Sequence, residues 1–215
     1  MSNQAPVSLQ LYSRLTRYLN YLKHLPTDRP ANISATVIAE ALGINDVVVR
    51  KDLASVVGTG KPKIGYITED LIEGLENYLG HNNRSEAVLV GAGNLGRALL
   101  SYGNFEEYGL NIVAAFDSNP NLIGSDVGGK KILAFEKLSE LCLRLHVHIG
   151  IITVPVASAQ HVCDCMVEGG IRAIWNFAPV NLSVPENVVI KNEDMAASLA
   201  LLTKKLEENF EKYGV

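Results

Sequence analysis

The sequence predicts an α/β protein in two parts, a small helical module followed by a parallel sheet with helices on both faces. Residues 1–66 hold eight Lys and Arg against four acidic residues, whereas the rest of the chain holds 11 against 19. From residue 87 onward, short runs rich in Val and Ile alternate with helical segments, as in a parallel sheet. The 215 residues are enough for two small domains.

Helical periodicity dominates the first module. Apolar residues recur at three- and four-residue steps from residue 11 to residue 22, and Pro26 ends this first helix. Two shorter helices follow over residues 33–58, separated at Gly43, with Ser34 and Asn45 as N-caps. Their inward faces are predicted to be Val37, Ile38, Ala41 and Leu42 in the first and Val48, Val49, Leu53 and Val56 in the second.

The spacing of Ala39, Gly43 and Val49 is that of a helix-turn-helix, which needs a small contact residue, a glycine turn and an apolar anchor. Residues 59–68 (TGKPKIGYIT) predict a hairpin-like wing, and residues 69–79 a further helix. A basic second helix beside a basic wing favours DNA binding over a bundle with a solvated charged face. Arg50 suits guanine or a phosphate, and Lys51 a phosphate. The DNA-binding candidates are Ser34, Asp46, Arg50, Lys51, Ser55, Lys61 and Lys63.

Residues 91–96 (GAGNLG) match G-x-G-x-x-G between a strand and a helix, the fingerprint of a bound dinucleotide. Asp117 ends the next strand, 21 residues after Gly96, near the spacing expected for the acid that binds a ribose diol. Its charge would repel the extra phosphate of NADP, so NAD(H) is the predicted ligand, with other adenine nucleotides as the alternative. The motif residues are Gly91, Ala92, Gly93, Asn94, Leu95 and Gly96.

Two later loops fall at the carboxyl ends of predicted strands, where ligands of open α/β sheets bind. Neither loop supplies the acid, base or positioned histidine that hydride transfer requires, so a sensor is favoured over an enzyme. An apolar slot here also favours NADH over NAD+, because the charged ring of NAD+ is costly to desolvate. The loop residues are Thr153, Val154, Pro155, Asn176, Phe177, Ala178 and Pro179.

Composition narrows the class of protein. No apolar run reaches the length of about 18 residues that spans a bilayer. The first residues lack the basic start and apolar core of a signal peptide, so a cytoplasmic location without membrane contact is expected. Cys142, Cys163 and Cys165 are expected to be reduced thiols, and no metal site is predicted.

Four runs together resemble the Rex family of redox-sensing transcriptional repressors: VRKDLASV, VLVGAGNLGRAL, AFDSNP and NFAPV. The resemblance implies a winged-helix DNA-binding domain at residues 1–80, a linker at 81–86 and a Rossmann NAD(H)-binding domain at 87–192. A C-terminal helix at 193–215 is then swapped within a homodimer. In this family NADH closes the dimer and releases double-stranded operator DNA.

The resemblance also implies a switch. Tyr102 falls at the expected switch tyrosine, and Asp194 and Met195 fall where the swapped helix enters the partner's nicotinamide pocket. We hypothesise that Tyr102 and Arg14 compete for the Asp194 carboxylate in different states.

The wing departs from the family pattern. That pattern reads G-x-R-G-V-G-Y, whereas this chain has GKPKIGY, with Pro62 in place of the arginine. Lys61 and Lys63 flank it but lack the planar fork of arginine, so operator preference is expected to differ. Two alternatives remain: a small NAD-dependent oxidoreductase with an accessory helical domain, and a dimeric nucleotide-binding interaction protein without operator recognition.

Overall fold

The computed structural model describes residues 8–26, 28–82 and 84–214. The chain divides into two compact units, Met1–Asn83 and Arg84–Val215. The first strand of the second unit begins at Ser85, so the last two residues of the linker expected at 81–86 belong to the sheet.

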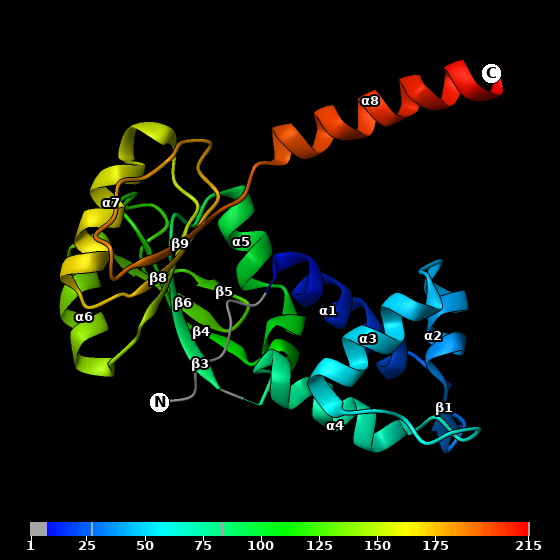
Figure 1. Ribbon diagram of the computed structural model, residues 1–215. Coiled ribbons are helices and arrows are strands. Elements are labelled where there is room, and N and C mark those ends of the chain that lie inside the picture. The colour runs from blue at the N-terminus through cyan, green and yellow to red at the C-terminus, as the bar shows by residue number, and fades with distance from the viewer. Residues whose placement is uncertain (1–7, 27, 83, 215) are drawn as a thin grey trace. The chain divides into compact units, whose positions relative to one another are not determined.

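The first unit is helical apart from one short antiparallel pair of strands (Figure 1). Asn45 caps its third helix through a 2.9 Å bond from the Val47 N–H, and Ser34 caps the second through a 3.2 Å bond from the Val37 N–H. Gly43 ends the second helix with φ 63°, the left-handed conformation that glycine adopts without strain. The predicted helix-turn-helix is therefore present. Its elements are α1 (Leu9–Lys23), β1 (Asn32–Ile33), α2 (Ala35–Leu42), α3 (Asp46–Val57), β2 (Tyr66–Ile67) and α4 (Thr68–Leu79).

One apolar core holds these helices together. On α3, Val49 and Leu53 are fully buried as predicted. On α2 the prediction was partly wrong, because Val37 is 44% exposed and Ala41 is exposed as well. The buried face of α2 is set instead by its first residue and the positions three and four residues after it. That face consists of Ala35, Ile38 and Ala39.

The second unit is a seven-stranded sheet in the order β5-β6-β4-β3-β7-β8-β9. Every neighbouring pair is parallel except β5 and β6, which confirms the predicted α/β class. Strands β5, β6 and β9 were not predicted. The elements are β3 (Ser85–Val90), α5 (Asn94–Leu100), β4 (Leu110–Asp117), β5 (Asp126–Val127), β6 (Lys130–Ala134), α6 (Leu138–Leu145), β7 (Ile149–Ile152), α7 (Val156–Glu168), β8 (Ala173–Asn176), β9 (Val189–Asn192) and α8 (Met195–Tyr213).

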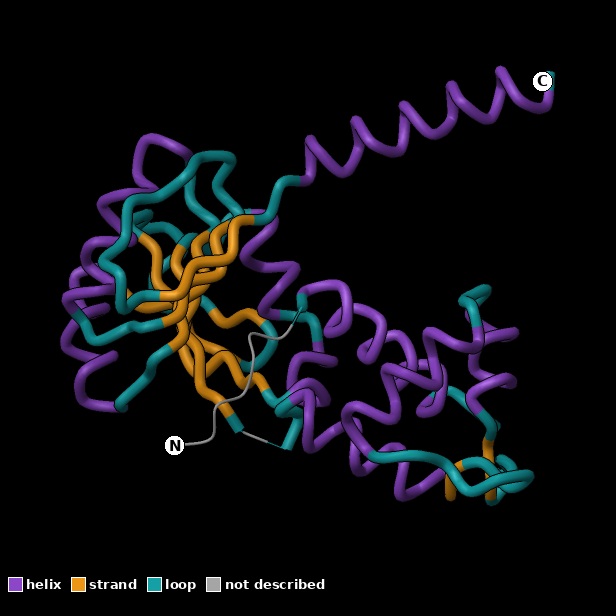
Figure 2. Tube along the Cα trace, viewed as in Figure 1, coloured by secondary structure: helices purple, strands orange, loops and turns teal. Residues whose placement is uncertain are grey.

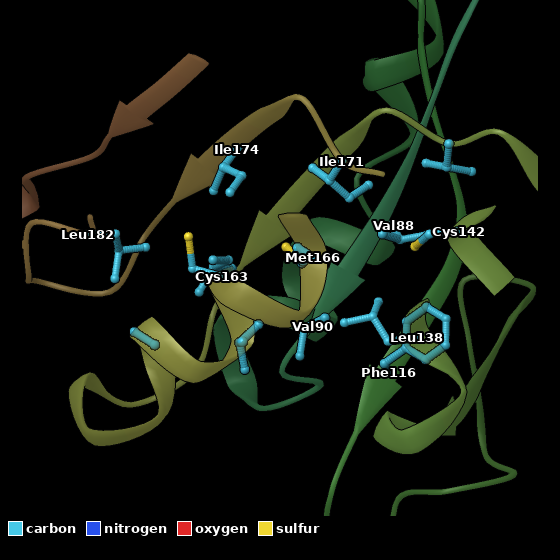
Figure 3. Packing of buried hydrophobic residues seen from close by; sticks show 14 of the residues in the cluster. Val88, Val90, Phe116, Leu138, Cys142, Cys163, Met166, Ile171, Ile174 and Leu182 are labelled. Atoms are coloured by element: carbon cyan, nitrogen blue, oxygen red, sulfur yellow. The ribbon is translucent and has the colours of Figure 1, made fainter. Parts of the chain in front are cut away.

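Helices cover both faces of this sheet (Figure 2). Val88 and Val90 of β3 belong to the core cluster that includes residues of α6 and α7 (Figure 3). Their neighbours Ala87 and Leu89 belong to a second cluster, which includes Leu100 of α5. Burial on both faces explains why β3 is apolar in consecutive positions. Within the described ranges, no helix is long and apolar enough to cross a membrane.

Candidate nucleotide pocket and DNA-facing helix

The sheet changes its winding direction between β3 and β7. From β3 the chain adds β4 and β6 on one side, and from β7 it adds β8 and β9 on the other. Open α/β sheets bind ligands at the carboxyl ends of the strands that flank such a point. Here the loops after β3 and β7 are tied together, because Thr153 donates its N–H to the Val90 oxygen at 2.9 Å and its hydroxyl to the Gly91 oxygen at 2.7 Å.

The three motif glycines have different surroundings. A Cβ on Gly96 would lie 1.9 Å from the Gly91 oxygen, and a Cβ on Gly91, which has φ 101°, would lie 2.7 Å from the Thr153 oxygen. These two glycines are required by packing. A Cβ on Gly93 would meet nothing within 4 Å, so the backbone there faces open space at the start of α5. The middle glycine is the one that a ligand can approach.

Asp117 lies at the end of β4 with both carboxylate oxygens turned to the backbone. One oxygen accepts the Ala92 N–H at 2.7 Å and the other accepts the Asn119 N–H at 2.8 Å. An ionised carboxylate has about four acceptor positions, so each oxygen retains capacity for a ligand hydroxyl. The same side chain therefore orients the glycine turn and presents acceptors at the pocket rim.

A cavity of about 490 Å³ opens at this point, within the range of small-molecule pockets. Sequence reasoning predicted part of its lining but missed the loop after Asp117 and the inner face of α7. No motif marks His161, whose ring packs against Phe135 with centroids 5.7 Å apart. The lining residues are Val90, Gly91, Gly93, Asp117, Ser118, Asn119, Leu122, Phe135, Thr153, Val154, Pro155, Ser158, His161 and Val162.

Several candidates lie outside this lining. They are Ala92, Asn94, Leu95, Gly96, Asn176, Phe177, Ala178 and Pro179. The Asn176 side chain is fully buried, and its amide nitrogen donates to the Val180 oxygen and the Asn192 Oδ1, both at 2.9 Å. Its own oxygen accepts the Ala178 N–H at 2.9 Å. Asn176 therefore fastens the loop between β8 and β9, and a contact of residues 176–179 with nicotinamide stays a prediction.

The residue before the cap of α8 contacts the aromatic side chain of Trp175. Asp194 caps this helix by accepting the Ala197 N–H at 2.7 Å, and the next residue, Met195, is 65% exposed. Just before the cap, Glu193 accepts the indole N–H of Trp175 at 2.9 Å. The Trp175 ring packs against Phe177, with centroids 4.8 Å apart. These contacts attach the chain segment that leads into α8 to β8.

Tyr102 belongs to the second unit and is half exposed, with its ring edge-on to Phe105 at 4.9 Å. Arg14 belongs to the first unit, where it forms two hydrogen bonds to Asp52, at 2.6 and 2.8 Å. In this structure Arg14 is thus paired within its own unit. Its contact with Asp194 stays a hypothesis.

Asp52 is a buried carboxylate that sequence reasoning assigned to neither face of α3. Besides Arg14 it accepts the hydroxyl of Tyr18 at 2.9 Å. Burial, and then the bond to Asp52, raise the pKa of Tyr18 to about 12. The bond to Asp52 likewise raises the pKa of Arg14. The network fixes α3 against α1.

The opposite side of α3 is exposed and polar. Arg50, Lys51 and Ser55 are exposed there, as predicted, and Asp46 is partly exposed. Arg50 forms a 2.6 Å ion pair with Asp46 one turn earlier. The Ser55 hydroxyl donates to the Asp52 backbone oxygen at 2.7 Å. This face offers two cations, one of which is held by an acid on the same helix.

The wing is a tight five-residue turn. Lys61 and Gly65 exchange two backbone hydrogen bonds of 2.8 Å each. The residues from Lys61 to Ile64 are all exposed. A Cβ on Gly65 would lie 2.3 Å from the Ile33 oxygen, so this glycine lets the turn sit against β1.

Cys165 lies beside His161, with its Sγ 3.9 Å from the His161 Nε2. All three cysteines are free thiols, and burial raises the pKa of Cys142 and Cys163 to about 11. In the described part of the chain no three His, Cys, Asp or Glu side chains are placed to hold a metal ion together.

Two family models match the two units. Residues 82–180 match a model described as "CoA binding domain". Residues 7–54 match one described as "Putative DNA-binding protein N-terminus".

Full-length relatives match nearly the whole chain. A protein of Porphyromonas gingivalis named "Redox-sensing transcriptional repressor Rex" is 40% identical over 90% of this chain and 89% of its own. A protein of the same name from Thermoanaerobacter pseudethanolicus is 35% identical over 97% of this chain and 93% of its own.

Solved structures match as closely. The crystal structure described as RSP in complex with beta-NAD+ and operator DNA superposes with a TM-score of 0.88 at 34% identity, covering 97% of both chains. RSP in complex with beta-NADH superposes with a TM-score of 0.84 at 34% identity, covering 97% of this chain and 99% of that one.

Proposed function

The chain belongs to the Rex family of redox-sensing transcriptional repressors, and on that premise we propose that it binds operator DNA and releases it when NADH binds. One observation carries the proposal. The pocket at the switch point joins an open glycine turn to a carboxylate with free acceptor positions, in a chain whose helix α3 also exposes Arg50 and Lys51.

NAD(H) is the ligand that this pocket suits. We expect Asp117 to accept the adenosine ribose hydroxyls and the pyrophosphate to lie against Gly93 and the start of α5. NAD and coenzyme A both contain an adenosine diphosphate. A domain that binds this group can therefore match a CoA-binding model. A carboxylate at the ribose excludes the extra phosphate that both NADP and coenzyme A carry there.

Double-stranded DNA is the partner that the first unit suits. The exposed side of α3 would enter the major groove, where Arg50 can form two hydrogen bonds to guanine and Lys51 can bind a phosphate. A repressor works where the chromosome is, so we propose a cytoplasmic location.

A homodimer is supported by α8. Its apolar residues at positions 195, 199, 202, 206, 210 and 213 follow steps of three and four, and within the described residues of the unit nothing covers them. Such a stripe is stable in water when a second copy buries it. We propose that α8 exchanges between two subunits and brings Asp194 and Met195 to the partner's pocket.

We further propose that this exchange couples the two sites, with Tyr102 and Arg14 as alternative partners of Asp194. NADH shifts the dimer only if it binds the closed form more tightly than the DNA-binding form. If Asp194→Ala left NADH-dependent DNA release unchanged, this coupling would be wrong.

A single titration tests the proposed function. Duplex DNA binding by the purified protein is measured against graded NADH at fixed salt, because phosphate contacts make affinity depend on ionic strength. Loss of binding as NADH rises is the expected result. Absence of DNA binding at every NADH level would favour a dimeric interaction protein, and substrate-dependent consumption of NADH would favour an oxidoreductase.

We propose a non-enzymatic role, since the relatives are named repressors. The pocket does hold two side chains capable of acid–base chemistry, Asp117 and His161. If the role is non-enzymatic, His161→Ala should leave any background NADH oxidation unchanged.

A further inference from the structure

Lys63 has an unusual backbone conformation. In the part of the chain that the structure describes, two residues other than glycine have positive φ, Lys63 at 65° and His146 at 53°. A side chain with a Cβ is disfavoured there, and glycine is the residue that adopts this region freely.

The turn itself imposes this conformation. Two backbone hydrogen bonds join Lys61 to Gly65, and the Ile64 N–H also donates to the Lys61 oxygen. These bonds close a loop of three residues. Pro62, second in the turn, has its φ fixed by its ring. The chain reverses at the next residue, where the left-handed conformation falls. Lysine at 63 is therefore kept against the local preference of the backbone, which calls for a function of its side chain.

The wing carries two exposed positive charges. Lys61 and Lys63 lie on either side of Pro62. Neither lysine forms an ion pair with any described residue. An exposed cation without a partner, held on a rigid turn, is suited to a phosphate group.

We propose that Lys63 carries the wing's contact with DNA, a contact with a phosphate group made from a strained backbone position. This inference rests on the proposed function and deepens it. Lysine is a point charge without the planar fork of arginine, so the contact adds affinity without reading bases. The wing of this protein then tolerates any base sequence beneath it, and recognition is left to α3.

Three variants test the inference. Lys63→Gly removes both the charge and the strain, whereas Lys63→Asn removes the charge but retains a residue that accepts the left-handed conformation. His146→Gly is the matched control, since it relieves a similar strain at the end of α6, outside the DNA-binding unit. Each is measured for thermal unfolding and for binding, over a salt series, to a duplex that the parent protein selects from a random-sequence pool.

Lys63→Gly is expected to have opposite effects on thermal stability and on DNA binding. Lys63→Gly should raise the unfolding midpoint of its unit by about 2–5 °C while weakening DNA binding. The slope of log affinity against log salt should become shallower by about 0.9 for each phosphate left without its lysine, or about 1.8 for a dimer on a two-fold site. Lys63→Asn should show the same change of slope, and His146→Gly should gain stability with unchanged DNA binding.

Base changes under the wing complete the test. Parent affinity should be insensitive to them, and a strong preference there would overturn the sequence-independent role. Parent-like salt slopes in both Lys63 variants would overturn the phosphate contact. A weakening confined to Lys63→Gly would assign the effect to loop flexibility instead. If the parent selects no duplex, the proposed function is wrong and this inference falls with it.

Discussion

Asp52 binds two side chains of α1 at once. Its carboxylate accepts two hydrogen bonds from Arg14 and one from Tyr18, inside the core of the DNA-binding unit. Removing one partner of a buried ion pair leaves an unpaired charge, which destabilises more than the pair itself stabilises. The orientation of α3, and so of Arg50 on its far side, depends on this carboxylate.

This network predicts a pH dependence of stability. The folded-state pKa of Tyr18, about 12, lies above its ordinary value of 10.0, so the folded protein holds the proton more tightly than the unfolded chain. The stabilisation is complete below pH 10 and is lost as the pH rises from 10 to 12. Urea unfolding over this range should show the loss, and Tyr18→Phe should be less stable at pH 8 but lack this part of the pH dependence.

Asp46 is expected to limit non-specific binding. Its carboxylate holds Arg50 in the free protein and would meet DNA phosphates at the start of α3. Asp46→Asn should strengthen binding to a scrambled duplex about two- to fivefold, equivalent to about 0.5–1 kcal/mol at an exposed site. Glu73→Gln removes the same charge from an exposed position on α4 and should change nothing. If the two variants strengthened binding equally, the effect of Asp46 would be due to the net charge of the protein and not to its position on α3.

Residues with local roles could be predicted, and residues with tertiary roles could not. Ser34 and Asn45 cap helices within three residues of themselves, so the sequence around them is sufficient. Asp52 interacts with Tyr18 and Arg14, which precede it by 34 and 38 positions in the sequence. A charged residue in an amphipathic helix is ordinarily assigned to solvent. His161 reaches the pocket only because α7 packs beside β7.

At the scale of elements, β3 and α5 are joined by a turn in which two glycines serve packing and one faces open space. Gly96 lies against the Gly91 oxygen, so α5 can approach the strand closely. Gly93 contacts nothing that a side chain would disturb. The motif therefore contains separate structural and ligand positions, which matched substitutions can distinguish.

Gly96→Ala should destabilise the second unit by about 2–4 kcal/mol, because its methyl group would lie 1.9 Å from the Gly91 oxygen. Gly93→Ala should leave the unfolding midpoint unchanged but weaken NADH binding at least tenfold, since a methyl group would stand where the pyrophosphate approaches. Calorimetry for binding and thermal unfolding for stability check both. A Gly93→Ala variant with parent-like NADH affinity would contradict the assigned position of the pyrophosphate.

The elements predicted from sequence were those with strong patterns. Strands β3, β4, β7 and β8 are rich in buried apolar residues, and each was expected. Strand β5 has only two residues, β6 begins with two lysines, and β9 is an edge strand with two polar residues at its end. Such edges are defined by their pairing with a neighbour, which a single segment does not show.

At the scale of the whole molecule, the exposed apolar stripe of α8 predicts that assembly controls DNA binding. Leu202→Glu together with Leu206→Glu should convert a dimer to a monomer in light scattering and weaken operator binding at least tenfold. Leu201→Glu is the matched control, because Leu201 is equally apolar but lies off the stripe. Dimers that persist in the double variant would show that α8 is not the dimer contact.

Trp175 gives this assembly an optical consequence. It is the single tryptophan of the chain, and its indole is hydrogen-bonded to Glu193, directly before the cap of α8. Any rearrangement of the segment that carries α8 must change the polarity around this one fluorophore. The emission of the unlabelled protein should therefore shift when DNA is added, so that the intrinsic fluorescence reports the transition between the closed form and the DNA-binding form.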